Sequence, residues 1–224
     1  MEKRDLDIIT NSAVNWRMYQ DTTVLITGAT GRLGRYILET LADIDLKYNL
    51  NMRIIGLARS EEKARSVFDN LLELPNVEFL YQDVNVSIDY SAKIDYIYHT
   101  AGPAAPKDYN SPVETLWAHV NGTHNVLECA RTHKTKRVFY VSTVETYGEW
   151  RSDEKIKESD MGIMRHLNSR ACYPEAKRLC ETMLTTYKQE YGISFCGVRL
   201  CHTLGPGVSL TDGRGFAEFM DCVL

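Results

Sequence analysis

A tyrosine and a lysine four residues apart are the first candidates for chemistry in this chain of 224 residues. Tyr173 and Lys177 lie in the segment YPEAK, at the start of a predicted helix that would place both side chains on one face. A phenol with a pKa of about 10 is a poor base at neutral pH, but an adjacent ammonium group stabilises its phenolate. The pair is therefore suited to taking a proton from a substrate hydroxyl.

Two hydroxyl side chains lie about thirty residues ahead of this tyrosine. Ser142 and Thr143 end the apolar segment RVFYVST, which is predicted to be a strand. A hydroxyl at that point can hydrogen-bond both the tyrosine and a substrate oxygen. We therefore predict a catalytic group of Thr143, Tyr173 and Lys177, and no metal site, since the sequence has neither a CxxC pair nor an HExxH motif.

Three glycines at fixed offsets form the second candidate site, in TGATGRLG at residues 27–34. An apolar strand precedes them, and a helical pattern begins inside the motif, so backbone N–H groups at the helix start can face an anion. The glycines would allow a tight turn, close approach of a pyrophosphate and close helix packing. A plain strand–helix turn is the alternative. The predicted cofactor residues here are Gly28, Thr30, Gly31, Arg32, Leu33 and Gly34.

The end of the second predicted strand bears on the choice of dinucleotide. A carboxylate there would bind the ribose 2′-hydroxyl, whereas an arginine would pair with a 2′-phosphate. The sequence reads LARSEEKA, with Arg59 at this point and no acid before Glu61. This favours NADP over NAD, although Arg59 could instead be a solvated residue that stacks on adenine.

These residues require an alternation of strands and helices to bring them together. Apolar segments predict strands at 23–27, 52–58, 77–81, 94–100, 137–143 and 194–200, and helical periodicity predicts helices at 32–44, 61–72, 113–132 and 174–190. Strands separated by helices pair in parallel. We therefore predict an α/β fold with a doubly wound parallel sheet and helices on both faces. Residues 1–22 form an N-terminal extension, and 23–224 form the NAD(P)-binding domain, with the start of a substrate-binding region at 200–224.

Composition bears on partners and location. The net charge of −4 gives no reason to expect nucleic acid as a partner. No apolar run approaches the roughly 20 residues that span a bilayer, and the N-terminus lacks the apolar core of a secretory signal. We therefore predict a cytoplasmic protein without a membrane partner.

The variant TGxxGxxG resembles the short-chain dehydrogenase/reductase superfamily, with its Rossmann-like fold. Further segments resemble the extended branch of that superfamily, which contains nucleotide-sugar epimerases, dehydratases and UDP-glucuronate decarboxylases. They are HTAGPAAP, VNGTHNVLE, STVETYG, RACYPEAKRLCET and VRLCHTLGPGVSLTDGRGF. RACYPEAKR and DGR are most like the decarboxylase members. The resemblance extends over residues 23–224.

The resemblance implies further site residues. On the cofactor side these are Asp83, Val84, Ala101, Gly102 and Asn121, besides Tyr173 and Lys177. On the substrate side they are Pro103, Glu145, Arg170, His202 and Arg214, of which Glu145 would also transfer protons beside the sugar. The family resemblance favours NAD as cofactor, and it implies a possible homodimer through the helices that follow the fourth and fifth strands.

Three departures limit this transfer. The dehydratases carry a Thr-Asp-Glu triplet whose aspartate protonates the departing hydroxyl, but Val144 stands there in this chain, which disfavours 4,6-dehydration. His202 replaces a usual asparagine. Members of the branch also run about 100 residues further, so we expect either a shortened chain or a natural short form with a reduced substrate site.

The sequence thus predicts an NAD(P)-dependent epimerase/dehydratase-family enzyme that oxidises C4 of a nucleotide sugar to a 4-keto intermediate, followed by epimerisation or decarboxylation. Two alternatives remain open. One is an NADPH-dependent carbonyl reductase, which Arg59 favours. The other is a non-catalytic dinucleotide-binding module, which would need the glycine turn but not the tyrosine–lysine pair.

Overall fold

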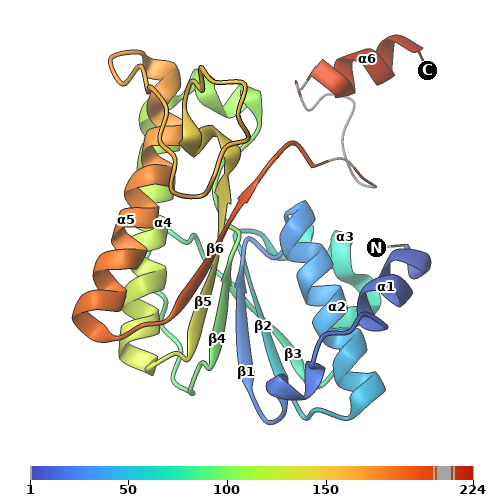
Figure 1. The fold of residues 1–224 in the computed structure, drawn as a ribbon. Helices are drawn as coiled ribbons and strands as arrows, with labels where there is room; N and C mark the ends of the chain where they lie inside the picture. The colour runs from blue at the N-terminus through green and yellow to red at the C-terminus, as the bar shows by residue number, and fades with distance from the viewer. Residues whose placement is uncertain (1, 204, 206–212, 214, 224) are drawn as a thin grey trace.

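Six parallel strands form one sheet in the computed structural model, which describes residues 2–203, 205, 213 and 215–223. The strand order is β3-β2-β1-β4-β5-β6 (Figure 1). The bounds are β1 Thr23–Thr27, β2 Arg53–Ala58, β3 Val77–Tyr81, β4 Tyr96–His99, β5 Arg137–Thr143 and β6 Phe195–Leu200. This is the strand order of dinucleotide-binding sheets built from two mononucleotide-binding halves.

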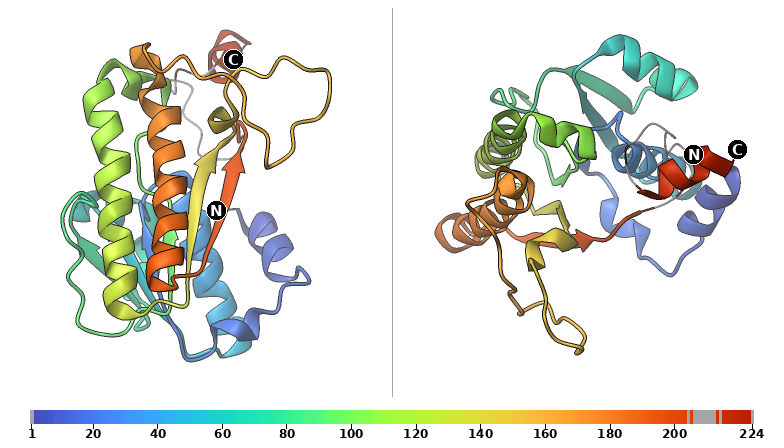
Figure 2. Two further views of the ribbon diagram at one scale, coloured as in Figure 1. Left: turned by 60° about the vertical axis from the view of Figure 1, so that its left-hand side comes forward. Right: turned by 90° about the horizontal axis from the view of Figure 1, so that it is seen from above.

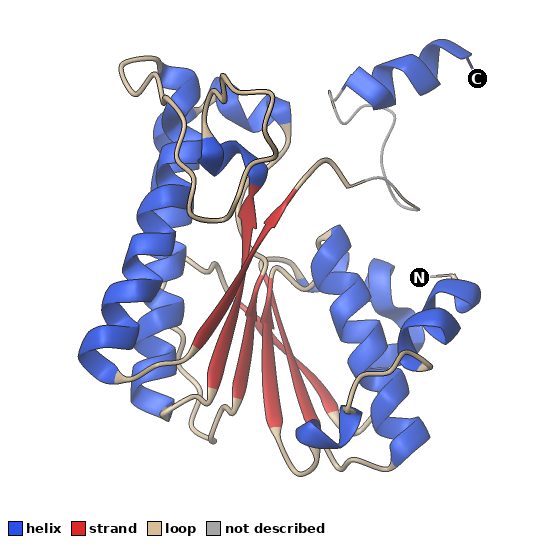
Figure 3. Cartoon of the chain, viewed as in Figure 1, coloured by secondary structure: helices blue, strands red, loops and turns tan. Residues whose placement is uncertain are grey.

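Helices cover both faces of the sheet, as predicted. Helices α2 (Arg32–Tyr48) and α3 (Glu61–Phe68) lie on one side, and α4 (Pro112–His133) and α5 (Cys172–Tyr191) on the other (Figure 1). Figure 2 shows the same division from two further directions, and Figure 3 shows the strands enclosed between the helices. The doubly wound architecture is therefore confirmed.

The alternation of side chains along each strand produces two separate cores. Along β1, Leu25 faces the core beneath α4 and α5, whereas Val24 and Ile26 face the core beneath α2. Each of these three side chains is fully buried. Strands buried on both faces are nearly continuous apolar runs, which is why the strand bounds were readable from sequence.

Shorter helical segments complete the fold. They are α1 Lys3–Thr10, α6 Gly215–Val223 and the 3₁₀ segments Trp16–Tyr19, Asp69–Glu73, Pro106–Asn110, Val144–Tyr147 and Ser169–Ala171. The helix predicted at 61–72 thus ends at Phe68 and continues as a 3₁₀ turn. Helix α5 begins at Cys172, so Pro174 falls in its first turn, where a missing N–H costs no helical hydrogen bond.

The N-terminal extension packs onto the rest of the molecule. The backbone carbonyl of Thr10 accepts hydrogen bonds from the Trp16 indole at 3.2 Å and the Tyr48 phenol of α2 at 3.1 Å. Tyr19 is 4% exposed and belongs to the core beneath α2. Residues 1–22 were predicted to be an N-terminal extension. Their described part packs against α2.

The sheet topology brings the candidate site residues to one edge. The connection order reverses between β1 and β4, and the carboxyl ends of parallel strands form a crevice at such a point. The glycine turn follows β1, Ala101 to Pro103 follow β4, and Thr143 ends β5.

Among the described residues, no helix combines the length and the apolar character that a membrane span requires.

Candidate active site and dinucleotide site

The glycine turn is held by close backbone contacts. Gly28 has a φ of +68°, in the left-handed region that favours glycine, and a Cβ there would lie 2.8 Å from the Cα of Ala101. A Cβ on Gly34 would lie only 2.3 Å from the carbonyl oxygen of Gly28. Helix α2 therefore starts directly against the end of β1, and side chains are excluded at both positions.

The same turn fits a dinucleotide pyrophosphate. Gly31 precedes the first helical residue and donates its N–H to the Gly28 carbonyl at 2.9 Å. A Cβ on Gly31 would meet the Gly28 oxygen at 3.1 Å and no other described atom within 4 Å, so an added side chain would fill open space before the helix. The first N–H groups of α2 have no partner within the helix, and that arrangement binds anions.

The flanking residues of the turn lie beside this helix start. Thr30, Arg32 and Leu33 are half-buried. The Arg32 guanidinium donates to the backbone carbonyl of Thr203 at 2.6 Å, and so joins the start of α2 to the segment that follows β6. The predicted pyrophosphate turn and the start of the predicted substrate region are therefore neighbours.

The remaining predicted cofactor residues differ in their surroundings. Arg59 is exposed at the end of β2. The Asp83 carboxylate accepts hydrogen bonds at 2.8 Å from the backbone and the side chain of Asn85, as an aspartate in a local turn does. Val84 is 7% exposed and belongs to the core beneath α4. The Ala101 N–H donates to Thr27 Oγ1 at 3.3 Å, which ties the end of β4 to β1.

Tyr173 and Lys177 are both buried, at 7% and 6% exposure. The Lys177 ammonium donates to the backbone carbonyl of Val141 in β5 at 2.7 Å and lies 4.7 Å from the centroid of the Tyr140 ring. Burial lowers the pKa of Lys177 to about 8. The lysine is thus anchored to the strand that ends at Thr143, and Tyr173 lies one turn before it on α5.

The two hydroxyl groups at the end of β5 have different hydrogen-bond partners. Ser142 donates to the Glu181 carboxylate at 2.5 Å, and Glu181 also pairs with Arg199 at 2.7 Å. Ser142 therefore belongs to a polar network between β5, α5 and β6. The Thr143 hydroxyl accepts from the backbone N–H of Glu145 at 3.3 Å. Thr143 thus bonds to a different partner from Ser142, and its catalytic role stays a prediction.

Two predicted substrate residues meet across a loop of about two dozen residues. The Arg170 guanidinium pairs with the Glu145 carboxylate at 2.9 Å and lies 4.0 Å from the centroid of the Tyr109 ring. A pocket of about 380 Å³ opens beside them, and it reaches the start of α5. Its lining includes Glu145, Gly148, Ile163, Arg165, Arg170 and Pro174.

The other predicted substrate residues are more dispersed. The Pro103 carbonyl accepts a hydrogen bond from a histidine of α4, at 2.8 Å. His202 is exposed beyond the end of β6. Arg214 lies outside the described residues. Of the predicted substrate set, the pocket therefore brings together only Glu145 and Arg170.

The sequence prediction missed one residue of this site. Asn121 is exposed on α4, whereas His119, two positions earlier, is 2% exposed and lies with its ring centroid 5.3 Å from that of Tyr173. Two residues correspond to about 200° around a helix, so the two side chains leave it on different sides. The signal that would have favoured His119 was its position around α4, which places its side chain on the side that faces Tyr173 of α5.

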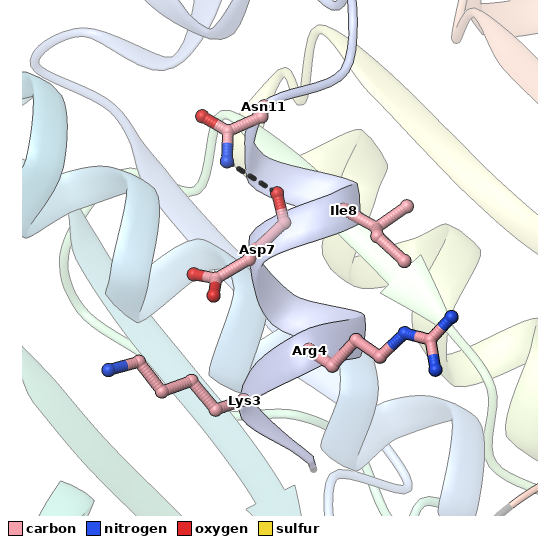
Figure 4. A pocket seen from close by; sticks show the side chains of 5 residues that line it. All are labelled: Lys3, Arg4, Asp7, Ile8 and Asn11. Carbon is pink, nitrogen blue, oxygen red and sulfur yellow. Dashed lines mark hydrogen bonds between the residues drawn. The ribbon is translucent and has the colours of Figure 1, made fainter.

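A second surface hollow lies away from this site. Side chains of α1 line it, namely Lys3, Arg4, Asp7, Ile8 and Asn11 (Figure 4). It contains none of the predicted site residues. Within the described parts of the chain, no three histidine, cysteine or acidic side chains are grouped closely enough to hold a metal ion.

The chain is similar to known proteins over most of its length. The family model for the NAD dependent epimerase/dehydratase family matches residues 24–221. UDP-glucuronic acid decarboxylase 1 of Xenopus tropicalis is 30% identical over 202 residues, which cover 88% of this chain and 45% of that protein. UDP-glucuronic acid decarboxylase 6 of Arabidopsis thaliana is 29% identical over 198 residues, covering 88% of this chain and 55% of that protein.

Solved structures share the fold at lower identity. The UDP-glucose 4-epimerase of Thermotoga maritima, solved with UDP-glucose, has a TM-score of 0.68 and 18% identity, covering 89% of this chain and 62% of that one. The UDP-glucuronic acid 4-epimerase of Bacillus cereus, solved with NAD, has a TM-score of 0.65 and 20% identity, covering 83% and 58%.

The chain spans about half the length of the curated relatives that it matches. The match to the family model nevertheless extends from β1 to α6, and it includes both the glycine turn and the tyrosine–lysine pair. The chain belongs to the NAD-dependent epimerase/dehydratase family.

Proposed function

We propose that this protein is an NAD-dependent enzyme that acts on a nucleotide-activated sugar and begins by oxidising its C4 hydroxyl. The observation that carries the proposal is the buried group at the end of β5, where Lys177 is bonded to Val141 and Tyr173 lies one turn away on α5. The names of the relatives, which are UDP-sugar decarboxylases and epimerases, support the substrate class.

The protein's part in the first step is proton transfer. Tyr173 takes the proton from the C4 hydroxyl, while Thr143 holds the substrate oxygen and Lys177 stabilises the phenolate. NAD, when bound, supplies the hydride acceptor. Gly28, Gly31 and the start of α2 hold its pyrophosphate.

The resulting 4-keto sugar has two outcomes that fit this site. The ketone acidifies the neighbouring carbon, which permits epimerisation, and it promotes loss of carbon dioxide from a uronic acid. Val144 has no proton to give, which disfavours 4,6-dehydration. Glu145 and Arg170, paired at 2.9 Å on the pocket, are the groups we place beside the sugar.

The cofactor assignment favours NAD over NADP. The family is NAD dependent by description, and the structure of the Bacillus cereus epimerase was solved with NAD. Arg59 is exposed and positioned after β2, where NADP binding would use an arginine. We propose that NAD is the working cofactor and that Arg59 contributes little to its affinity.

The test is mass spectrometry of the products after incubation with NAD and a panel of UDP-, dTDP- and GDP-sugars. We expect one sugar to be converted without net consumption of NAD, and Tyr173→Phe to lower the rate by about 10²- to 10⁴-fold. Tyr191→Phe, an exposed tyrosine at the end of the same helix, is the matched control.

Other outcomes would replace this proposal. Stoichiometric consumption of NADPH with a simple ketone would identify a carbonyl reductase. Dinucleotide binding without turnover of any sugar would identify a binding module. Unchanged turnover in Tyr173→Phe would remove the proton-transfer role from this residue.

We also propose a homodimer through α4 and α5. These neighbouring helices expose large apolar side chains, with Val113 at 68%, Trp117 at 53% and Leu179 at 47%. Sedimentation equilibrium should show a dimer that Trp117→Glu dissociates, because burying a charge at an interface is unfavourable. A monomeric wild-type protein would contradict this.

We place the enzyme in the cytoplasm. All six cysteines are free, and unpaired thiols suit a reducing compartment. Fractionation of the source cells with an antibody to the protein tests the assignment, and recovery in a secreted fraction would contradict it.

A further inference from the structure

His119 contacts two different parts of the site at once. Its Nε2 lies 2.8 Å from the carbonyl oxygen of Pro103, and its ring centroid lies 5.3 Å from that of Tyr173, with 58° between the ring planes. The side chain projects from α4 and is 2% exposed. A single buried side chain therefore joins the turn after β4 to the start of α5.

The protonation state of this histidine follows from its surroundings. A carbonyl oxygen only accepts hydrogen bonds, so Nε2 must carry the hydrogen that it donates to Pro103. Burial, together with the neighbouring charge of Lys177, lowers the pKa of His119 to about 2. The ring is therefore neutral, with Nδ1 unprotonated, and it adds no second positive charge beside Lys177.

The turn after β4 is shaped to this ring. Gly102 has a φ of +146°, and a Cβ there would lie 2.3 Å from His119 Cε1 and 2.6 Å from Nδ1. Any larger residue at Gly102 would push against the imidazole. This close approach fixes the distance between the imidazole ring of His119 and the turn at Gly102.

A second ring contacts the same tyrosine. Tyr109 lies with its centroid 5.4 Å from that of Tyr173, at 37°, and carries the Arg170 guanidinium 4.0 Å from its own centroid. Tyr109 belongs to the 3₁₀ turn Pro106–Asn110, which continues the chain from Pro103. The Tyr173 ring is thus packed against two rings that the β4–α4 connection and α4 itself supply.

We propose that His119 is a positioning residue, whose ring fixes the Tyr173 phenol and whose Nε2–H fixes the Ala101–Pro103 turn on which the cofactor would lie. The inference rests on the proposed role of Tyr173 in proton transfer. It assigns two separable contributions to one side chain. The ring contact acts on the proton acceptor, and the hydrogen bond acts on the dinucleotide side.

Two substitutions separate these contributions. His119→Gln keeps an N–H donor at the reach of Nε2 but removes the ring, and His119→Leu removes both. His124→Ala is the matched control, because His124 is an exposed histidine of the same helix that contacts Tyr187 instead.

The first measurement needs neither cofactor nor turnover. N-acetylimidazole modifies accessible tyrosines, and peptide mass spectrometry gives the rate at each position. We expect Tyr173 to react about tenfold faster in His119→Gln and His119→Leu, since loss of packing permits local opening. Tyr140, at 1% exposure, is the internal standard that should not change.

The second measurement divides binding from turnover. His119→Gln should bind NAD within about twofold of wild type, and His119→Leu about fivefold to tenfold more weakly, as loss of one hydrogen bond predicts. With the converted sugar, His119→Gln should lower kcat about tenfold with an unchanged KM, because a misplaced reacting group lowers the rate rather than the affinity.

Each outcome decides the inference. Wild-type reactivity of Tyr173 in His119→Gln would show that the ring does not position the phenol. Faster reaction of Tyr140 and Tyr173 together would show general loosening, and it would also overturn the proposal. If Tyr173→Phe retains turnover, the proposed function fails, while the reactivity and NAD measurements still test His119 separately.

Discussion

The turn after β1 and the loop after β5 lie at the same edge of the sheet but are held by different kinds of interaction. Gly28 and Gly34 hold the turn through backbone atoms, at separations that admit no side chain. The loop side depends on long charged groups, with Glu145 and Arg170 joined by a half-exposed ion pair. Backbone contacts in a core are rigid and costly to change, whereas exposed ion pairs are weak and exchangeable.

This difference fits the two binding roles in the proposed function, one for the cofactor and one for the substrate. A cofactor that remains the same through every turnover is matched by a rigid backbone cradle. A substrate that must enter, react and leave is matched by side chains that can change partners. The buried Lys177 belongs to the rigid part, since it is anchored to β5.

The largest effect is expected in the glycine turn. Gly34→Ala places a methyl group 2.3 Å from a backbone oxygen, and the helix must shift to admit it. We expect the free energy of unfolding to fall by about 3 kcal/mol in denaturant titrations. Gly197→Ala is the control, because a Cβ there meets no described atom within 4 Å. Equal stability of the two variants would show that the turn is not rigid.

The second effect concerns the charge of Lys177. Its pKa is about 8 in the folded protein against 10.5 for an unperturbed lysine, so the unfolded chain binds more protons between these values. Wild-type stability should therefore rise across this pH range, relative to Lys177→Met, by on the order of 3 kcal/mol. Lys188→Met should keep the wild-type rise. Parallel pH curves for wild type and Lys177→Met would contradict the burial argument.

The substrate side should respond in function more than in stability. Arg170→Met breaks the half-exposed pair with Glu145, and the unfolding free energy should change by less than about 1 kcal/mol. NAD affinity should be retained, and KM for the sugar should rise about tenfold through loss of a charged contact. Arg131→Met, which breaks a similar pair with Glu128 on α4, should leave KM unchanged. A large loss of NAD affinity in Arg170→Met would show that Arg170 serves the cofactor side as well as the substrate side.

The smallest effect is expected at Arg59. Its side chain is exposed after β2, so Arg59→Ala should change unfolding by less than about 0.5 kcal/mol. NAD affinity should stay within about twofold, while NADP affinity should fall about tenfold if the guanidinium meets a 2′-phosphate. Isothermal titration with both dinucleotides measures this. A loss of NAD affinity equal to that of NADP would place Arg59 against the shared adenosine.

Some features of the site were readable from local pattern. The strands at 23–27 and 137–143 have the predicted bounds, because strands buried on both faces leave continuous apolar runs. The conformation of Gly28 followed from the need for a turn between strand and helix. The placement of Tyr173 and Lys177 one turn apart on α5 followed from helical spacing alone.

Other features depend on how the elements pack. The sequence placed Ser142 and Thr143 side by side at the end of a strand, and only the contact of β5 with α5 and Arg199 shows that Ser142 is bonded to Glu181. It named Asn121 for the cofactor side and gave no sign that the packing of α4 against α5 turns His119 toward Tyr173. It gave no sign that Arg170 would pair with Glu145 from a distant part of the chain.

The sequence by itself determined the order of strands and helices, the glycine turn and the residue types available for proton transfer. These are local properties, set by side-chain periodicity and by the conformational freedom of glycine. Tertiary structure decided which side chains face one another and how burial lowers the pKa of Lys177 to about 8. Helix rotation and desolvation depend on contacts between distant segments, and no short stretch of sequence contains them.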